Sequence, residues 1–266
     1  MTLALSQQGK QVVATLRANL PPAVLLTGPR GVGLKTIATR FGDTPRIIVP
    51  ELQTKTSTIP QISIDTIREL YTDTRAKQTN SRVIVIDDAD KMSLPAQNSF
   101  LKLLEEPTPH VHFILTSHHA ERLLPTVRSR LQAYHLPALS PPETAQFIAN
   151  LPSQSRDKQT QLLYIASGLP AELMRLIEDE NYFEQAKSRM QIVRQILDND
   201  RYSRTTAAMK ITLDRNSTLE LVEAAIDVLA RQPSTSNVAR MKQLLDGYQN
   251  IQNGGNIKLQ LVRALA

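Results

Sequence analysis

Residues 23–36 read AVLLTGPRGVGLKT: a short apolar run, a glycine-rich turn and the start of a helical pattern. A phosphate-binding loop requires this context, because glycines let the backbone turn its N–H groups toward an anion at a positive helix end. Four further apolar runs follow, at 46–49, 83–86, 112–115 and 133–136. Runs of this length indicate strands buried on both faces, as in a parallel sheet covered by helices.

Helical patterns lie between these runs, and Ser63 and Ser93 can each cap one of them. Beyond Ser140 no further strand pattern occurs. Ser217 and Glu220 have the spacing of a capping box before another helical stripe. The sequence therefore predicts an α/β domain with a parallel sheet, followed by helices alone.

Composition excludes several classes of site. Cysteine is absent, which rules out disulfides, thiolate-ligated zinc and thiol nucleophiles. No stretch approaches the roughly 20 apolar residues that a membrane span needs, so we expect a soluble, cytoplasmic protein with no membrane contact. The net charge of +6 is compatible with nucleic acid. Because aromatic residues make up only 4%, stacking on bases is not expected as the main binding mode.

The glycine-rich loop departs from a working phosphate loop. The working pattern is Gly, four residues, Gly, Lys, then Ser or Thr. With Gly28 and Gly33 as the glycines, Leu34 takes the Lys position and Lys35 the hydroxyl position. Sliding the register to use Lys35 and Thr36 would place Leu34 where glycine is needed. We favour the first register, which predicts weak or absent ATP hydrolysis.

Other interpretations of the loop stay open. It can bind nucleotide loosely without hydrolysing it, or it can be a glycine-rich turn with no phosphate role. It can also work in the shifted register, which would make the chain an active ATPase. The candidate nucleotide-binding residues are Gly28, Pro29, Gly31, Gly33, Lys35 and Thr36.

Acidic residues end the third apolar run, at the sheet edge where ligands of open α/β sheets bind. Asp87 suits the carboxylate that helps to hold magnesium in phosphate-loop ATPases. Asp88 stands where many of these enzymes carry the Glu that polarises water, and it is one methylene shorter. The alternative is that both acids cap the next turn.

Four strings in order make the pattern more specific: VIDDADKM at 85–92, AQNSFLKLLEEP at 96–107, FILTS at 113–117 and LLPTVRSR at 123–130. This set resembles the bacterial clamp-loader branch of the AAA+ superfamily, and within it the delta-prime subunits of DNA polymerase III. The resemblance spans most of the chain and is strongest over 82–131.

The resemblance implies a role in DNA replication, helping to load a sliding clamp onto primed DNA within a hetero-pentamer of clamp-loader subunits. Polymerase activity itself is not expected. It also implies three domains: a RecA-like AAA+ module at 1–137, a helical lid at 138–185 and a helical collar at 186–266.

The same resemblance assigns candidate residues. Arg130 corresponds to the arginine finger that reaches a neighbouring ATP site, with Arg128 as the nearby alternative. Thr116 and Ser117 take sensor-like positions. Lys102 is a candidate DNA contact, although a solvated lysine is an equal interpretation.

Departures from the active pattern at Leu34, Asp88 and one further position favour a non-hydrolysing subunit. The family's nucleotide-sensing Arg, three residues after a glycine, is Ala171 here. The zinc module of many relatives is missing, and His110, His118 and His119 lack the spacing and acidic partners of a metal site. We therefore expect no zinc and no required cofactor, and a delta-prime-like chain that donates Arg130 in trans. The alternative is an active gamma/tau-like ATPase.

Overall fold

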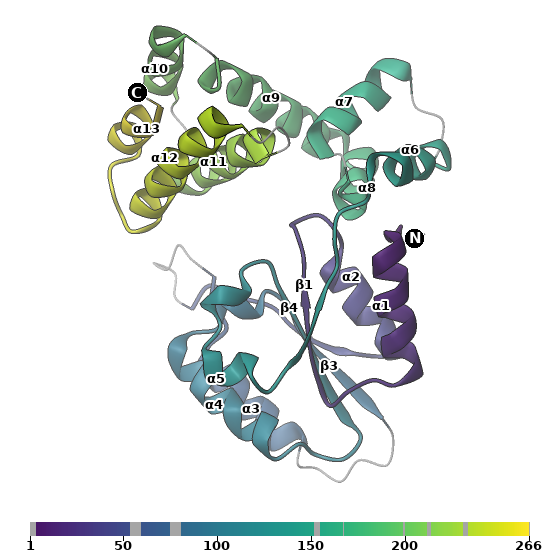
Figure 1. Cartoon of the computed structure of the whole chain (residues 1–266). Helices are drawn as coiled ribbons and strands as arrows, with labels where there is room; N and C mark the ends of the chain where they lie inside the picture. The colour runs from purple at the N-terminus through teal and green to yellow at the C-terminus, as the bar shows by residue number, and fades with distance from the viewer. Residues whose placement is uncertain are drawn as a thin grey trace. The chain divides into compact units, whose positions relative to one another are not determined.

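The computed structural model describes residues 4–53, 60–74, 81–151, 155–166, 168–198, 200–211, 214–230 and 234–265. The chain divides into two compact units, Met1–Leu176 and Ile177–Ala266 (Figure 1). Helix α9 (Glu180–Ile196) runs through the expected boundary between lid and collar at 185/186. The division into three domains stays a prediction.

All five apolar runs form strands of one parallel sheet, as predicted from the sequence. The strands are β1 (Ala23–Thr27), β2 (Arg46–Ile48), β3 (Arg82–Ile86), β4 (Val111–Ser117) and β5 (Gln132–His135), in the spatial order β2-β3-β4-β1-β5. Because the strands are parallel, the glycine-rich loop after β1 and the acids after β3 emerge at the same edge. The parallel α/β sheet followed by helices, which the sequence predicts, is confirmed.

Helices cover both faces of this sheet, with α1 and α2 on one face and α3 and α4 on the other (Figure 1). The bounds are α1 (Gln7–Ala18), α2 (Leu34–Ala38), α3 (Ile64–Thr74), α4 (Leu94–Glu105) and α5 (Pro125–Arg128), with short 3-10 turns at Thr39–Phe41, Ala89–Lys91 and Ala120–Arg122. Ser93 caps α4 as expected, because its hydroxyl accepts the N–H of Ala96 at 3.3 Å.

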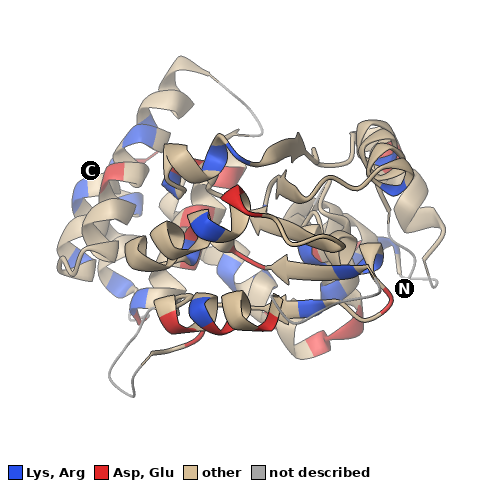
Figure 2. Cartoon of the chain, turned by 90° about the horizontal axis from the view of Figure 1, so that it is seen from below, with Lys and Arg blue, Asp and Glu red and all other residues tan. Residues whose placement is uncertain are grey.

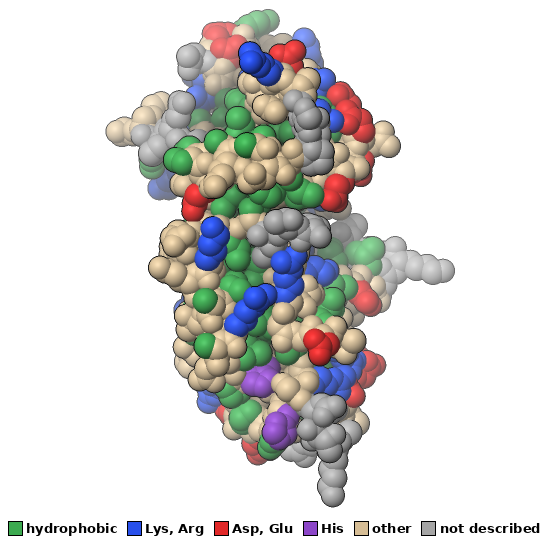
Figure 3. Space-filling view, turned by 90° about the vertical axis from the view of Figure 1, so that its right-hand side faces the viewer, with side chains coloured by type: hydrophobic (Ala, Val, Ile, Leu, Met, Phe, Trp, Pro, Cys, Tyr) green, Lys and Arg blue, Asp and Glu red, His purple; other side chains and the backbone are tan. Residues whose placement is uncertain are grey.

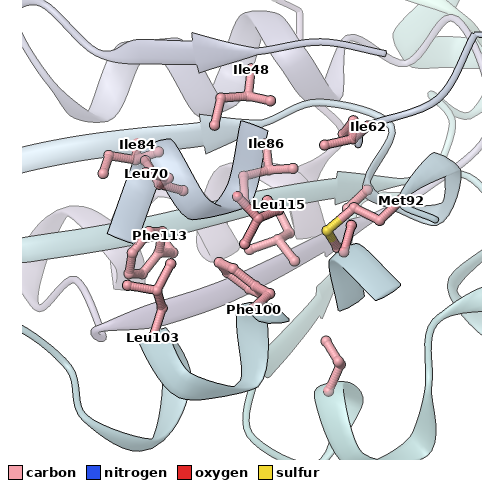
Figure 4. Close-up of a cluster of buried hydrophobic side chains, with 14 of the residues drawn as sticks. Ile48, Ile62, Leu70, Ile84, Ile86, Met92, Phe100, Leu103, Phe113 and Leu115 are labelled. Carbon is pink, nitrogen blue, oxygen red and sulfur yellow. The ribbon is translucent and has the colours of Figure 1, made fainter. Parts of the chain in front are cut away.

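Two apolar clusters explain why the three central strands are apolar without alternation, whereas the expected burial on both faces is wrong for the edge strands, since β2 is partly exposed and β5 largely exposed. Leu25 of β1 packs into the cluster on the α3–α4 face, whereas Val24 and Leu26 pack into the cluster beneath α1 and α2. In the first cluster, the rings of Phe100 and Phe113 meet edge to face with centroids 5.3 Å apart (Figure 4). A strand that serves two cores needs an apolar side chain at every position.

Three helices follow directly after the sheet in the described residues: α6 (Pro141–Ala149), α7 (Arg156–Ala166) and α8 (Pro170–Glu178), which ends just past the unit boundary at 176/177. Ser140 and Glu143 form a reciprocal capping box at the start of α6. The second oxygen of the Glu143 carboxylate accepts the backbone N–H of Gln7 at 2.8 Å, which ties α6 to the start of α1.

The second unit is helical throughout its described residues. It contains α9, α10 (Arg201–Lys210), α11 (Arg215–Ala230), α12 (Thr235–Gln252) and α13 (Ile257–Leu265). The expected capping box at Ser217 and Glu220 is wrong, because α11 begins earlier. Asp214 is the cap: its carboxylate accepts both the N–H and the hydroxyl of Ser217, at 3.0 and 2.8 Å. Among the described helices, none is long and apolar enough to cross a membrane.

Candidate functional site

The glycine-rich loop has a backbone that only its own glycines can adopt. Gly31 and Gly33 have φ values of +83° and +96°, in the left-handed region that disfavours side chains. A Cβ at Gly28 would lie 2.4 Å from the carbonyl oxygen of Leu136. Leu34 is already the first residue of α2 and is buried, with 2% of its surface exposed. The helix therefore starts directly after Gly33, and Leu34 points into the core.

Lys35 contacts the acidic strand end. Its Nζ lies 3.1 Å from Oδ2 of Asp87, and the Lys35 side chain is 48% exposed while that of Asp87 is 18% exposed. Oδ1 of Asp87 accepts the hydroxyl of Thr116 at 2.8 Å, and the same hydroxyl accepts the backbone N–H of Asp88 at 3.1 Å. Both carboxylate oxygens of Asp87 are thus engaged by groups of the chain itself. The loop, the acidic strand end and one sensor-like residue come together here.

Asp88 has its own set of partners. Its backbone is left-handed, with φ and ψ both +50°. Its carboxylate accepts the Lys91 ammonium at 2.7 Å and lies 3.8 Å from Nε2 of His118. Burial alone would raise the pKa of Asp88, but the hydrogen bond and charge of Lys91, with the charges of His118 and Arg30, outweigh it and lower that pKa. Asp88 is therefore a paired carboxylate rather than a free base.

His118 links this pair to the loop, which the sequence did not reveal. Its Nδ1 donates to the carbonyl oxygen of Gly28 at 2.8 Å while its Nε2 faces Asp88. A second histidine also has an acidic neighbour, since Nδ1 of His119 lies 3.3 Å from Glu121. Even so, the described residues contain no group of three or more side chains placed to hold a metal ion.

The two sensor-like residues separate. Adjacent side chains of a strand point to opposite faces. Thr116 reaches Asp87, whereas the hydroxyl of Ser117 donates to buried Asp90 at 2.7 Å and accepts the N–H of His119 at 3.1 Å. Ser117 therefore braces the loop after β4 instead of facing the site.

Helix α8 begins against the glycine-rich loop. The carbonyl oxygen of Gly31 accepts the backbone N–H groups of Ala171 and Glu172, at 2.9 and 3.2 Å. The first turn of a helix leaves such N–H groups without intrahelical partners, so the loop carbonyl satisfies them. A Cβ at Gly31 would lie 2.8 Å from Cβ of Glu172, which leaves no space between loop and helix at this point.

Arg130 lies in the turn that follows α5, away from this cluster in the sequence. Its guanidinium donates to Glu105 at 2.8 Å and to the carbonyl oxygen of Thr126 at 2.9 Å, and its side chain is 38% exposed. Arg128 is exposed and, within the described part of the chain, its side chain makes no hydrogen bond or ion pair. Buried Gln97 fixes the chain before α5, because its Oε1 accepts the N–H of Leu124 at 2.7 Å.

Lys102 lies exposed in the last turn of α4. Charge on the chain is mixed: Lys and Arg alternate with Asp and Glu along the helices in Figure 2, and the face in Figure 3 carries basic side chains among apolar ones. Neither view has a dense basic stripe, so the charge pattern alone does not single out a nucleic-acid surface.

Comparison with known proteins gives one family match and partial matches to individual proteins. Residues 45–140 match the family described as DNA polymerase III, delta subunit. The delta-prime subunit of DNA polymerase III from Pseudomonas aeruginosa is 30% identical over 118 residues, which are 43% of this chain and 36% of that protein. The gamma/tau subunit from Mycobacterium tuberculosis is 34% identical over 77 residues, or 29% of this chain and 13% of that protein.

A solved structure, that of a gamma-subunit-related protein of DNA polymerase III from Thermotoga maritima, covers 97% of both chains with a TM-score of 0.48 and 17% identity. The matched region spans little more than a third of the length of the Pseudomonas relative. Over these partial matches, the chain is similar to delta-prime and related clamp-loader subunits of DNA polymerase III.

Proposed function

We propose that this chain is a non-hydrolysing subunit of a clamp loader, which works in a hetero-oligomer to place a sliding clamp on primed DNA during replication. In that assembly Arg130 completes the ATP site of a neighbouring subunit. The observation that carries the proposal is the placement of Arg130 in an exposed turn, as the last residue of the LLPTVRSR string that resembles the clamp-loader motif.

The contacts of Arg130 suit a group that acts in trans. Its only acidic partner in the described part of the chain is Glu105, which is itself half-exposed. A surface ion pair of this kind contributes about 0–1 kcal/mol, so little free energy is lost when the guanidinium leaves it. A planar, permanently charged guanidinium then has the geometry to pair with phosphate oxygens of the neighbour's nucleotide. Glu105 holds the Arg130 side chain in place until the neighbour's nucleotide is present.

The chain's own site supports a subunit that does not hydrolyse ATP. Leu34 replaces the phosphate-binding Lys and is buried. Asp88, in the place of the water-polarising Glu, is paired with Lys91. Without these two functions the site lacks both a cation for the terminal phosphates and a free carboxylate beside the water.

Steady-state ATPase assays with the chain alone and mixed with its cognate motor subunit, clamp and primed DNA test this proposal, with size-exclusion chromatography to follow assembly. We expect no turnover by the chain alone, assembly with the motor subunit, and turnover in the mixture. Robust turnover by the chain alone would overturn the proposal.

The similarity to gamma/tau subunits favours a second candidate, an active ATPase that uses Lys35 and Thr36. This candidate requires turnover by the chain alone that Lys35→Ala abolishes. The same assay, run with that variant, separates the two functions.

A further inference from the structure

The fold family implies a magnesium–nucleotide complex between the loop and the acidic strand end, and the residues present do not fit it. Magnesium takes oxygen ligands in a strict octahedral arrangement. At this type of site the protein supplies a hydroxyl at the start of the helix and an acid at the strand end, with a Lys at the terminal phosphates. Here the hydroxyl position holds Lys35, whose ammonium has three donors and no lone pair for a metal.

Both carboxylate oxygens of Asp87 also have partners within the chain. Oδ2 of Asp87 faces the Lys35 ammonium at 3.1 Å, and Oδ1 accepts the Thr116 hydroxyl at 2.8 Å. A divalent cation at Asp87 would have to displace Lys35 or sit beside a like charge. The Asp87 side chain is only 18% exposed, so without a cation nearby its charge would be poorly solvated.

We propose that the Lys35 ammonium takes the place of magnesium at Asp87. With this internal cation, the glycine-rich loop and helix α8 stay in contact in the absence of nucleotide. This inference rests on the proposed non-hydrolysing role and gives it a physical cause. A bound magnesium ion would neutralise the acid at a working site, whereas here the Lys35 ammonium of the chain itself faces Asp87.

Helix α8, in the region expected to form the lid, makes the second set of contacts. The N–H groups at the start of α8 are satisfied by the carbonyl oxygen of Gly31, at 2.9 Å from Ala171 and 3.2 Å from Glu172. No phosphate is needed to satisfy these donors. Loop, acidic strand end and lid helix are therefore joined by contacts of the chain itself, which suits a subunit that stays in one form while its neighbours cycle.

The inference predicts that two substitutions return magnesium dependence to the site. Leu34→Lys/Lys35→Thr restores the Gly-Lys-Thr order after Gly33 and removes the internal cation from Asp87. Binding of a fluorescent ATP analogue to the full chain would be measured with magnesium and with EDTA. We expect no magnesium dependence for the wild type, and binding at least about tenfold tighter with magnesium than with EDTA for the double variant.

Two controls make the result decisive. Adding Asp87→Asn to the double variant should remove the gained magnesium dependence, and circular dichroism should show that all variants are folded. Magnesium-dependent binding by the wild type would overturn the inference, as would a folded double variant with no magnesium dependence. Because the assay uses the chain alone, its outcome is separate from whether Arg130 acts on a neighbour.

Discussion

Gly31→Ala tests the contact between the glycine-rich loop and helix α8. The new Cβ would lie 2.8 Å from Cβ of Glu172, an atom next to the backbone that cannot swing away. Alanine at φ +83° costs about 1 kcal/mol in strain. Moving the helix away also weakens the two hydrogen bonds to the Gly31 carbonyl, each contributing about 1 kcal/mol. We expect a total loss of about 3 kcal/mol for the first unit.

Gly254→Ala is the matched control. Gly254 has a similar φ of +94°, but nothing lies within 4 Å of the position that its Cβ would take. This variant should lose only about 1 kcal/mol of stability, from the backbone strain of alanine at positive φ. Replacing glycine by alanine also lowers the entropy of the unfolded chain, which affects both variants alike. The difference of about 2 kcal/mol between the variants therefore measures the clash with α8.

Urea unfolding gives the free energies, and hydrogen exchange locates the effect. In Gly31→Ala, the amides of Ala171 and Glu172 should exchange about tenfold faster or more, because the carbonyl oxygen that protects them has moved. Equal destabilisation by Gly31→Ala and Gly254→Ala, with unchanged exchange at these amides, would refute the contact.

Other predictions concern the core and the paired acid. Phe100→Ala removes a fully buried ring from its edge-to-face contact with Phe113 and should destabilise the first unit by about 3–5 kcal/mol in urea unfolding; a loss below about 1 kcal/mol would contradict the packing. Asp88→Asn should destabilise the protein at neutral pH, because the folded pKa of Asp88 lies below its ordinary value of 3.8. That stability is present above the unfolded pKa and is lost as pH falls through the folded pKa, so the difference between Asp88→Asn and wild type should shrink in acid unfolding curves. A difference that is constant with pH would show that the pairing with Lys91 is absent.

The sheet could be predicted from the sequence because its signal is local. Each buried strand is a short apolar run, and the helix caps at Ser63 and Ser93 are side chains next to the backbone groups that they satisfy. The cap of α11 was misplaced for the same kind of reason: Ser217 and Asp214 both have capping side chains, and only the start of the helix decides between them.

The site was only partly predictable. Residue types indicated a loop register and roles for Asp87 and Thr116, and these roles stay predictions. The contacts of Lys35 and His118 join segments far apart in the sequence, at 3.1 Å to Asp87 and 2.8 Å to Gly28, and no local pattern encodes them. The alternation of side chains along a strand could have shown in advance that Thr116 and Ser117 point to opposite faces of β4 and cannot share one site.

The most direct test of the central claim is the ATPase rate of the assembled complex, with clamp and primed DNA, containing wild-type chain, Arg130→Ala or Arg128→Ala. Loss of an arginine finger typically slows phosphoryl transfer by about 10³-fold or more at the site that it serves. We predict that Arg130→Ala silences the neighbouring site while Arg128→Ala retains near wild-type turnover, with both variants still assembling. Full turnover at every site of a complex containing Arg130→Ala would contradict the account.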